Sequence, residues 1–157
     1  MQNRREFLRN TMLAGAGCLA AGALRADAAR VAEGGAPMLG FACKPMETVR
    51  VGVVGVGERG TYALKRLAFV PGVEIAAFCD VKEAAMKGCR DFLAEKKLRP
   101  AREFLGPEAY KDLCQWDGVD VVYACVPWKL HAPVALAAMR ADKHAFVEVP
   151  ATMDVDS

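Results

Sequence analysis

The sequence lacks a metal-binding cysteine pattern, an excess of charge of one sign and a high aromatic content. No CxxC pair occurs among its six cysteines, and only His131 and His144 could join them, so no zinc site is expected. Twenty-one Lys and Arg residues against nineteen Asp and Glu residues give a net charge of only +2, which provides no field for nucleic acid. With 54% hydrophobic and 25% charged residues in 157, the composition also excludes disordered, collagen-like and disulfide-dense chains.

Residues 1–28 have the features of an export signal. Adjacent Arg4 and Arg5 precede an apolar, Ala- and Gly-rich run over 11–24, and residues 26–28 form an A-x-A cleavage site. The arginine pair resembles that of twin-arginine signals, so we expect export to the periplasm by the twin-arginine (Tat) machinery. The run is shorter than the roughly 20 apolar residues of a spanning helix, so no stable membrane span is expected.

Two alternatives remain open for this segment. Cys18 could be acylated as in a lipoprotein, although the three residues before it lack the usual Leu. The segment could instead be a basic helix of the fold. Its removal would leave a mature chain with balanced charge, because it contains four arginines and two acids.

The rest of the chain alternates between strand-like and helix-like segments after a linker. Residues 29–48 carry Gly, Ala and Pro without a period, which predicts that linker. Strands are expected over 49–55, 73–80, 101–104, 119–126 and 145–149, with helices over 58–70, 82–97, 107–116 and 133–141. Strands separated in this way require crossovers and a parallel sheet, and nearly continuous apolar strands require cover on both faces. The prediction is therefore an α/β fold, a Rossmann-type doubly wound and mainly parallel sheet over 49–157, with mostly buried free thiols.

A glycine-rich turn between the first strand and the first helix carries the main chemical signal. Gly55, Gly57 and Gly60 form GxGxxG, and Asp80 ends the next strand. In a dinucleotide-binding unit these glycines allow a sharp turn, close approach of the pyrophosphate and tight helix–strand packing. Asp80 would accept hydrogen bonds from the adenosine ribose and repel a 2′-phosphate, which favours NAD over NADP. The alternative is a tight turn for which Asp80 serves only as a cap.

Two further loops follow strand ends at the same edge of the sheet. Trp128 and His131 lie in VPWKLHAP (126–133), where Pro127 directs the chain over the carboxyl edge. Trp128 could cover a cofactor, whereas His131 taken alone fits capping or packing better than chemistry. Glu148 ends the last strand and could be a ligand contact or a solvated acid.

Four blocks together resemble the N-terminal domain of the Gfo/Idh/MocA oxidoreductases: VRVGVVGVGERG, FCDV, VDVVYACVPWKLHAPVALAAM and KHAFVEVPATM. Ordinary dehydrogenases of that family read Glu-Lys-Pro in the last block, whereas Val149 replaces the lysine here. The Glu-Val-Pro version, with Pro-Trp-x-x-His and a twin-arginine leader, resembles glycoside hydrolase family 109. Such enzymes are similar to α-N-acetylgalactosaminidases that retain NAD while they oxidise the sugar, eliminate the glycosidic group, add water and return the hydride.

The resemblance implies specific cofactor contacts. The implied NAD-binding residues are Gly55, Gly57, Glu58, Arg59, Gly60, Asp80, Trp128, Lys129, Leu130, His131, Glu148 and Val149. The family's catalytic Tyr and His lie beyond residue 157, so no catalytic residue is assigned.

The resemblance also implies a second, substrate-holding domain that this sequence lacks. We therefore expect the chain to bind NAD without turning over a sugar or glycoside, and the complete protein could be an oligomer. The alternatives are part of an NAD-dependent sugar or polyol dehydrogenase, which Val149 disfavours, and a non-catalytic nucleotide-binding module.

Overall fold

The computed structural model describes residues 43–152. The predicted export signal, Cys18 and most of the predicted linker therefore lie outside the described residues. The chain divides into two units, Met1–Lys44 and Pro45–Ser157, and all the described helices and strands belong to the second. Residues 43–48, the described end of the predicted linker, form neither helix nor strand.

Strands and helices alternate throughout the second unit. In chain order they are β1 (Val49–Val54), α2 (Glu58–Leu67), β2 (Val73–Asp80), α3 (Glu83–Glu95), β3 (Arg102–Leu105), α4 (Ala109–Gln115), β4 (Val121–Ala124), a 3₁₀ turn (Trp128–Leu130), α5 (His131–Arg140) and β5 (His144–Val147). No described helix is both long and apolar enough to cross a bilayer.

The strands form one parallel sheet in the order β3-β2-β1-β4-β5. The predicted Rossmann-type fold class is thus confirmed. After β1 the chain first builds outward through β2 and β3, and then returns to the other side of β1 for β4 and β5. The order therefore reverses beside β1, and in open α/β sheets ligands bind at the carboxyl ends of the strands at this point.

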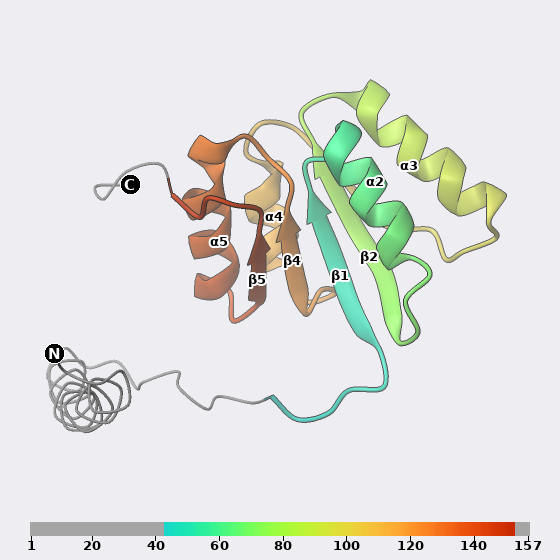
Figure 1. The fold of residues 1–157 in the computed structure, drawn as a ribbon, viewed down its shortest axis with the longest axis horizontal. Coiled ribbons are helices and arrows are strands. Elements are labelled where there is room, and N and C mark those ends of the chain that lie inside the picture. The colour runs from blue at the N-terminus through green and yellow to red at the C-terminus, as the bar shows by residue number, and fades with distance from the viewer. Residues whose placement is uncertain (1–42, 153–157) are drawn as a thin grey trace, which may run out of the picture. The chain divides into compact units, whose positions relative to one another are not determined.

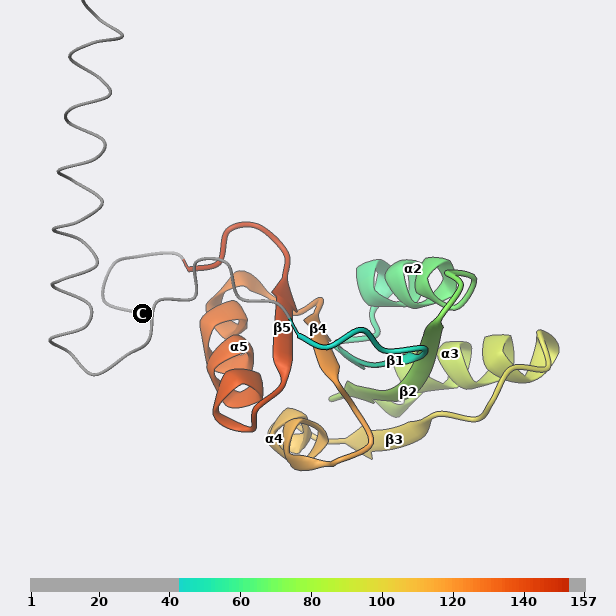
Figure 2. The same ribbon diagram turned by 90° about the horizontal axis from the view of Figure 1, so that it is seen from below.

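Helices cover the sheet from both sides (Figures 1 and 2). Helices α2 and α3 pack on one face, whereas α4 and α5 pack on the other. Two apolar clusters fill these layers: Val53, Leu64 and Phe78 belong to the first, and Leu113 and Val122 to the second. Both faces of the central strands are therefore dry, which agrees with their nearly continuous apolar sequence.

The elements differ from their predicted bounds mainly around β4. We expected a strand over 119–126, but pairing covers only Val121–Ala124. Val119 is fully buried in the preceding loop, so its apolar character reflects packing rather than strand pairing. Helix α5 begins at His131, two residues before the predicted start. Pro133 fits its first turn, where a missing N–H costs no helical hydrogen bond.

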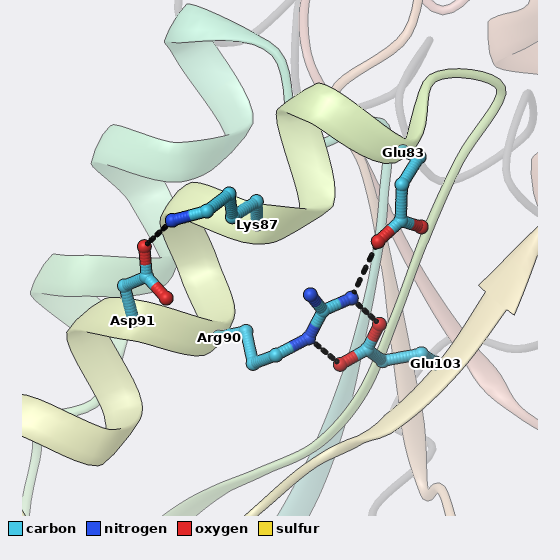
Figure 3. Close-up of polar contacts among 5 residues, drawn as sticks. All are labelled: Glu83, Lys87, Arg90, Asp91 and Glu103. Carbon is cyan, nitrogen blue, oxygen red and sulfur yellow. Dashed lines mark hydrogen bonds and ion pairs between the residues drawn. The ribbon is translucent and has the colours of Figure 1, made fainter.

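An ionic cluster links α3 to the edge strand β3 (Figure 3). The Arg90 guanidinium donates from Nε and Nη2 to both carboxylate oxygens of Glu103, at 2.7 and 2.6 Å, and from Nη2 to Glu83 at 2.8 Å. The contact with Arg90 holds the pKa of Glu103 below its usual range. These charged side chains thus hold the four-residue edge strand β3 to its neighbouring helix.

Candidate functional site

The turn after β1 has a backbone shape that only glycine fits well. Gly55 has φ +83°, and its N–H donates to the carbonyl oxygen of Cys79 at 2.8 Å. A Cβ at Gly55 would lie 2.5 Å from the carbonyl oxygen of Cys125. The turn is therefore wedged between the ends of β2 and β4, which fixes its position at the carboxyl edge.

The other two glycines of the motif serve different purposes. A Cβ built on Gly60 would lie 1.7 Å from the carbonyl oxygen of Gly55, so α2 can approach the turn only because residue 60 has no side chain. A Cβ on Gly57 would meet nothing within 4 Å. The backbone at Gly57 is thus open to a ligand, whereas that at Gly60 is closed by the protein itself.

The start of α2 offers unpaired amides beside this open backbone. Gly57 is the N-cap residue, and no side chain caps the helix. The first amides of an α-helix have no intrahelical acceptor, and the helix dipole adds partial positive charge there. Thr61 donates from Oγ1 to the carbonyl oxygen of Val56 at 2.7 Å, which steadies the turn from inside the first helical turn. This arrangement suits a phosphate group.

Asp80 faces the glycine turn from the end of β2. Its Oδ2 accepts the N–H of Val56 at 2.8 Å, and its Oδ1 accepts the N–H of Lys82 at 2.9 Å. The carboxylate therefore caps two loops at once. Because a carboxylate has about four acceptor positions, capacity remains for the hydroxyls of a ligand. The cap and ligand interpretations of Asp80 are compatible.

A cleft of about 340 Å³ extends from Asp80 across the turn to the start of α5. Its walls are mostly apolar and come from the loops that follow β1, β2, β3 and β4 and from the starts of the helices after them; they include Val81, Pro107, Tyr110, Pro127 and Leu130. Cys79 and Cys125 also line it. Burial raises the pKa of the Cys79 thiol to about 12 and that of Cys125 to about 11, so both are neutral thiols near pH 7.

The predicted residues after β4 are placed in different ways. Trp128 is 57% exposed and borders an open hollow of about 410 Å³ that Lys129 also lines. His131 is only 1% exposed, with Nδ1 2.6 Å from the carbonyl oxygen of Pro150 and Nε2 2.9 Å from that of Val126. His131 therefore packs beneath the loop and links it to the segment after β5.

Arg59, Tyr123 and Glu148 form a second polar group at the carboxyl edge. Glu148 Oε1 accepts from the Tyr123 hydroxyl at 2.5 Å and from Arg59 Nε at 2.9 Å, and it forms an ion pair with Arg59 Nη2 at 2.6 Å. The hydrogen bond from Tyr123, followed by that from Arg59, lowers the pKa of Glu148. Burial, and then this hydrogen bond, raises the pKa of Tyr123 to about 12. The acid is thus ionised and the phenol protonated at neutral pH.

Tyr123 is the site residue that the sequence interpretation missed. Its one sequence signal is alternation along β4: Val122 and Ala124 enter the cluster beneath α4 and α5, whereas Tyr123 packs with the cluster beneath α2 and α3. Two other predicted residues point to solvent: Glu58 is exposed in the first turn of α2, and the Val149 side chain is 85% exposed.

The residues present fit a dinucleotide. The turn at Gly57 leaves room for phosphate, unpaired amides lie beside it, and Asp80 borders the adjoining cleft. Within residues 43–152, no three His, Cys, Asp or Glu side chains are grouped so that they could hold a metal ion.

Comparison with known proteins agrees with this geometry. The profile of an oxidoreductase family with an NAD-binding Rossmann fold, Gfo/Idh/MocA, matches residues 49–157. A glycosyl hydrolase family 109 protein of Saccharopolyspora erythraea is 41% identical over 98% of this chain and 34% of its own length. An α-N-acetylgalactosaminidase of Shewanella oneidensis is 36% identical over 98% of this chain and 35% of its own length. The chain thus spans about a third of the length of these curated relatives.

Solved structures show the same fold. Scyllo-inositol dehydrogenase from Lactobacillus casei, with bound NAD(H) and scyllo-inositol, superimposes with a TM-score of 0.61 at 24% identity, over 69% of this chain and 30% of that one. Myo-inositol dehydrogenase from the same organism, in complex with NAD(H) and myo-inositol, gives 0.58 at 26% identity, over 67% and 29%. With its glycine turn, its parallel sheet and the profile match over residues 49–157, the chain belongs to the Gfo/Idh/MocA oxidoreductase family and has that family's NAD-binding Rossmann domain.

Proposed function

We propose that this chain is the NAD-binding part of an exported glycosidase that retains its cofactor through the catalytic cycle. In this proposal the sugar is oxidised, the glycosidic group is eliminated, water is added and the hydride is returned, so that no NADH accumulates. The names of the glycosyl hydrolase family 109 relatives support a glycoside substrate.

The residues of this chain would bind and orient NAD, whose nicotinamide ring supplies hydride acceptance and return when bound. The amides at the start of α2 would hold the pyrophosphate, and Asp80 would hold the adenosine ribose. Trp128 to His131 and Glu148 with Val149 would line the nicotinamide side. Of this set, the buried His131 would act through the loop that it supports rather than by direct contact.

Val149 is the observation that favours a glycosidase over a simple dehydrogenase. Its side chain is 85% exposed, directly after Glu148 and the end of β5. Ordinary dehydrogenases that the sequence resembles have lysine in this position as an acid or base. Valine cannot take or give a proton, so the simple alcohol dehydrogenation of those enzymes lacks its proton carrier here.

A chimera tests this proposal. This chain would replace the matching N-terminal third of the Saccharopolyspora erythraea relative, and the product would be assayed on an aryl α-N-acetylgalactosaminide without added NAD. We expect release of the aryl group, no net NADH, and bound NAD in the purified protein.

The controls separate the alternatives. The same chimera with Asp80→Ala should purify with little NAD and recover activity only at high added cofactor. Net NADH formation from a free sugar or polyol, without glycoside cleavage, would instead establish the dehydrogenase. Failure of a folded chimera to retain NAD would contradict the tightly bound cofactor on which the proposal depends.

A further inference from the structure

Tyr123 and Arg59 both contact the same carboxylate oxygen of Glu148. The Tyr123 hydroxyl and Arg59 Nε each donate a hydrogen bond to Oε1, and Arg59 Nη2 forms an ion pair with the same oxygen. Among residues 43–152, no group donates to Oε2. One oxygen of an ionised carboxylate is therefore saturated by the protein, while the other keeps its acceptor capacity.

The two donors come from elements on either side of Glu148. Arg59 lies in the first turn of α2, next to the glycine turn, and Tyr123 lies on β4, which pairs with β5. The Tyr123 ring also contacts Phe146 of β5, with 6.2 Å between ring centroids. Tyr123 thus fixes both the strand and the carboxylate that follows it.

The segment after Glu148 is held from the other side of the sheet. His131, at the start of α5, lies with Nδ1 2.6 Å from the Pro150 carbonyl oxygen. Residues 148–150 are therefore anchored at both ends, so the direction of the Glu148 side chain depends on fixed partners rather than on a flexible loop.

The position of Arg59, Tyr123 and Glu148 in the sheet indicates which part of the cofactor lies near Oε2 of Glu148. Asp80 marks the adenosine half of the cofactor on the β2 side of β1. A dinucleotide bound across the reversal in strand order has its nicotinamide half on the opposite side, over β4 and β5. Glu148 and Tyr123 both belong to that side. The nicotinamide half carries hydrogen-bond donors, namely the carboxamide N–H groups and the ribose hydroxyls.

We propose that Tyr123 is a positioning residue for NAD: with Arg59 it saturates Oε1 of Glu148 and thereby presents Oε2 to the donors of the nicotinamide half. The inference rests on NAD binding and not on the glycosidase activity proposed above. The glycine turn and Asp80 make no contact with Tyr123 among the described residues, so binding of the adenosine half of NAD should not depend on Tyr123.

Binding of NAD, ADP-ribose and ADP to the full chain tests this inference. Tyr123→Phe removes one hydrogen bond to a charged group and keeps the ring, so it should weaken NAD about tenfold. Affinity for ADP, which lacks the nicotinamide half, should stay within about twofold of the wild-type value. ADP-ribose then identifies the donor: a loss like that of NAD assigns the ribose hydroxyls, and retained affinity assigns the carboxamide.

Two further variants keep the result interpretable. Glu148→Gln removes the charge at nearly constant shape and should reproduce the selective loss of NAD. Tyr62→Phe is the matched control, because that ring is exposed on α2 and contacts only the guanidinium of Arg66 among described charged groups. It should leave the affinities for NAD, ADP-ribose and ADP unchanged. Equal losses for NAD and ADP in Tyr123→Phe, or unchanged NAD affinity, would overturn the proposal. Loss confined to NAD and ADP-ribose, or to NAD, would support it.

Discussion

At the scale of single residues, one motif contains three glycines with three different physical causes. Gly55 is required by a positive φ, Gly60 by contact between backbones, and Gly57 by neither. Nothing in the described protein occupies the space that a Cβ at Gly57 would fill. If glycine is needed at this position, the reason is therefore the approach of a ligand. Substitution can therefore separate binding from folding within six residues.

We expect Gly60→Ala to lower the free energy of unfolding by about 3 kcal/mol or more, because its Cβ would overlap the Gly55 carbonyl oxygen. Gly57→Ala should change that free energy by less than about 1 kcal/mol, since φ at Gly57 is −61° and the space is open.

NAD at a hundredfold excess over its Kd should stabilise the wild type by about 2.7 kcal/mol and should not stabilise Gly57→Ala. Thermal unfolding with and without NAD measures all of these effects. A Gly57→Ala protein that keeps the full NAD-induced stabilisation would show that the pyrophosphate lies elsewhere.

At the scale of elements, side-chain contacts between neighbouring strands fix the sheet at the end opposite the site. Arg50 of β1 donates to Asp120, just before β4, from its backbone N–H at 2.8 Å and from Nη2 at 2.6 Å. The Asp120 N–H returns a bond to the Arg50 carbonyl oxygen at 2.8 Å. These contacts hold the start of β4 beside β1. The order of the strands reverses at this pair, and the cleft lies at the opposite, carboxyl edge of the sheet.

The pH dependence of stability should report this contact. The hydrogen bonds from Arg50 lower the pKa of Asp120 in the folded chain, so its contribution is present above the ordinary aspartate pKa and is lost as the pH falls through the lower, folded value. Asp120→Asn should cost about 1–2 kcal/mol at neutral pH, and this cost should shrink as the pH falls below the ordinary aspartate pKa and through the lower, folded value. Denaturant unfolding across this pH range measures the difference. Asp117→Asn is the control, because that carboxylate is fully exposed and its recorded contact is a distant 4.0 Å pair with Lys143. A cost for Asp120→Asn that does not vary with pH would contradict this explanation.

Helices α3 and α5 end close to their predicted ends, but without the glycine that commonly follows a helix. Both α3 and α5 are followed by a residue with positive φ, and neither residue is glycine: Lys97 has φ +54° and Asp142 has φ +56°. The N–H of Leu98 nevertheless donates back to Leu93 at 2.9 Å, and that of Lys143 to Ala138 at 3.0 Å. These helix ends are therefore closed by non-glycine residues in the left-handed region.

At the scale of the whole molecule, the proposed export and the proposed retention of NAD support each other. The twin-arginine route, which the leader resembles, carries folded proteins, so a cofactor bound in the cytoplasm would travel with its protein. Retained NAD suits a protein outside the cytoplasm, where a soluble cofactor would be scarce. The expected export signal therefore belongs to the same proposal as the catalytic cycle in which the hydride is returned to the sugar.

We predict that replacing both Arg4 and Arg5 by lysine will remove most of the periplasmic pool of the protein. Fractionation of cells and immunoblotting measure this, with a strain lacking the twin-arginine translocase for comparison. Arg9→Lys is the matched control, since Arg9 lies outside the adjacent pair, and it should be exported normally. Unchanged export of the double variant, or export in the translocase-deficient strain, would show that another route is used.

The sequence by itself determined the parallel α/β fold, the glycine turn and the acid at the end of β2, because each depends on short-range patterns: apolar strands, glycine spacing and strand-end position. The tertiary structure alone decided which side chains meet. From the sequence, Tyr123 could not be distinguished from the apolar residues of its strand. In the fold, β4 pairs with β5, and this pairing brings the Tyr123 hydroxyl to Glu148. His131 was open to several interpretations until α5 packed it between two carbonyl groups. Residues far apart in the chain come within hydrogen-bonding distance only through the order of the strands, and that order is set by packing of the whole sheet.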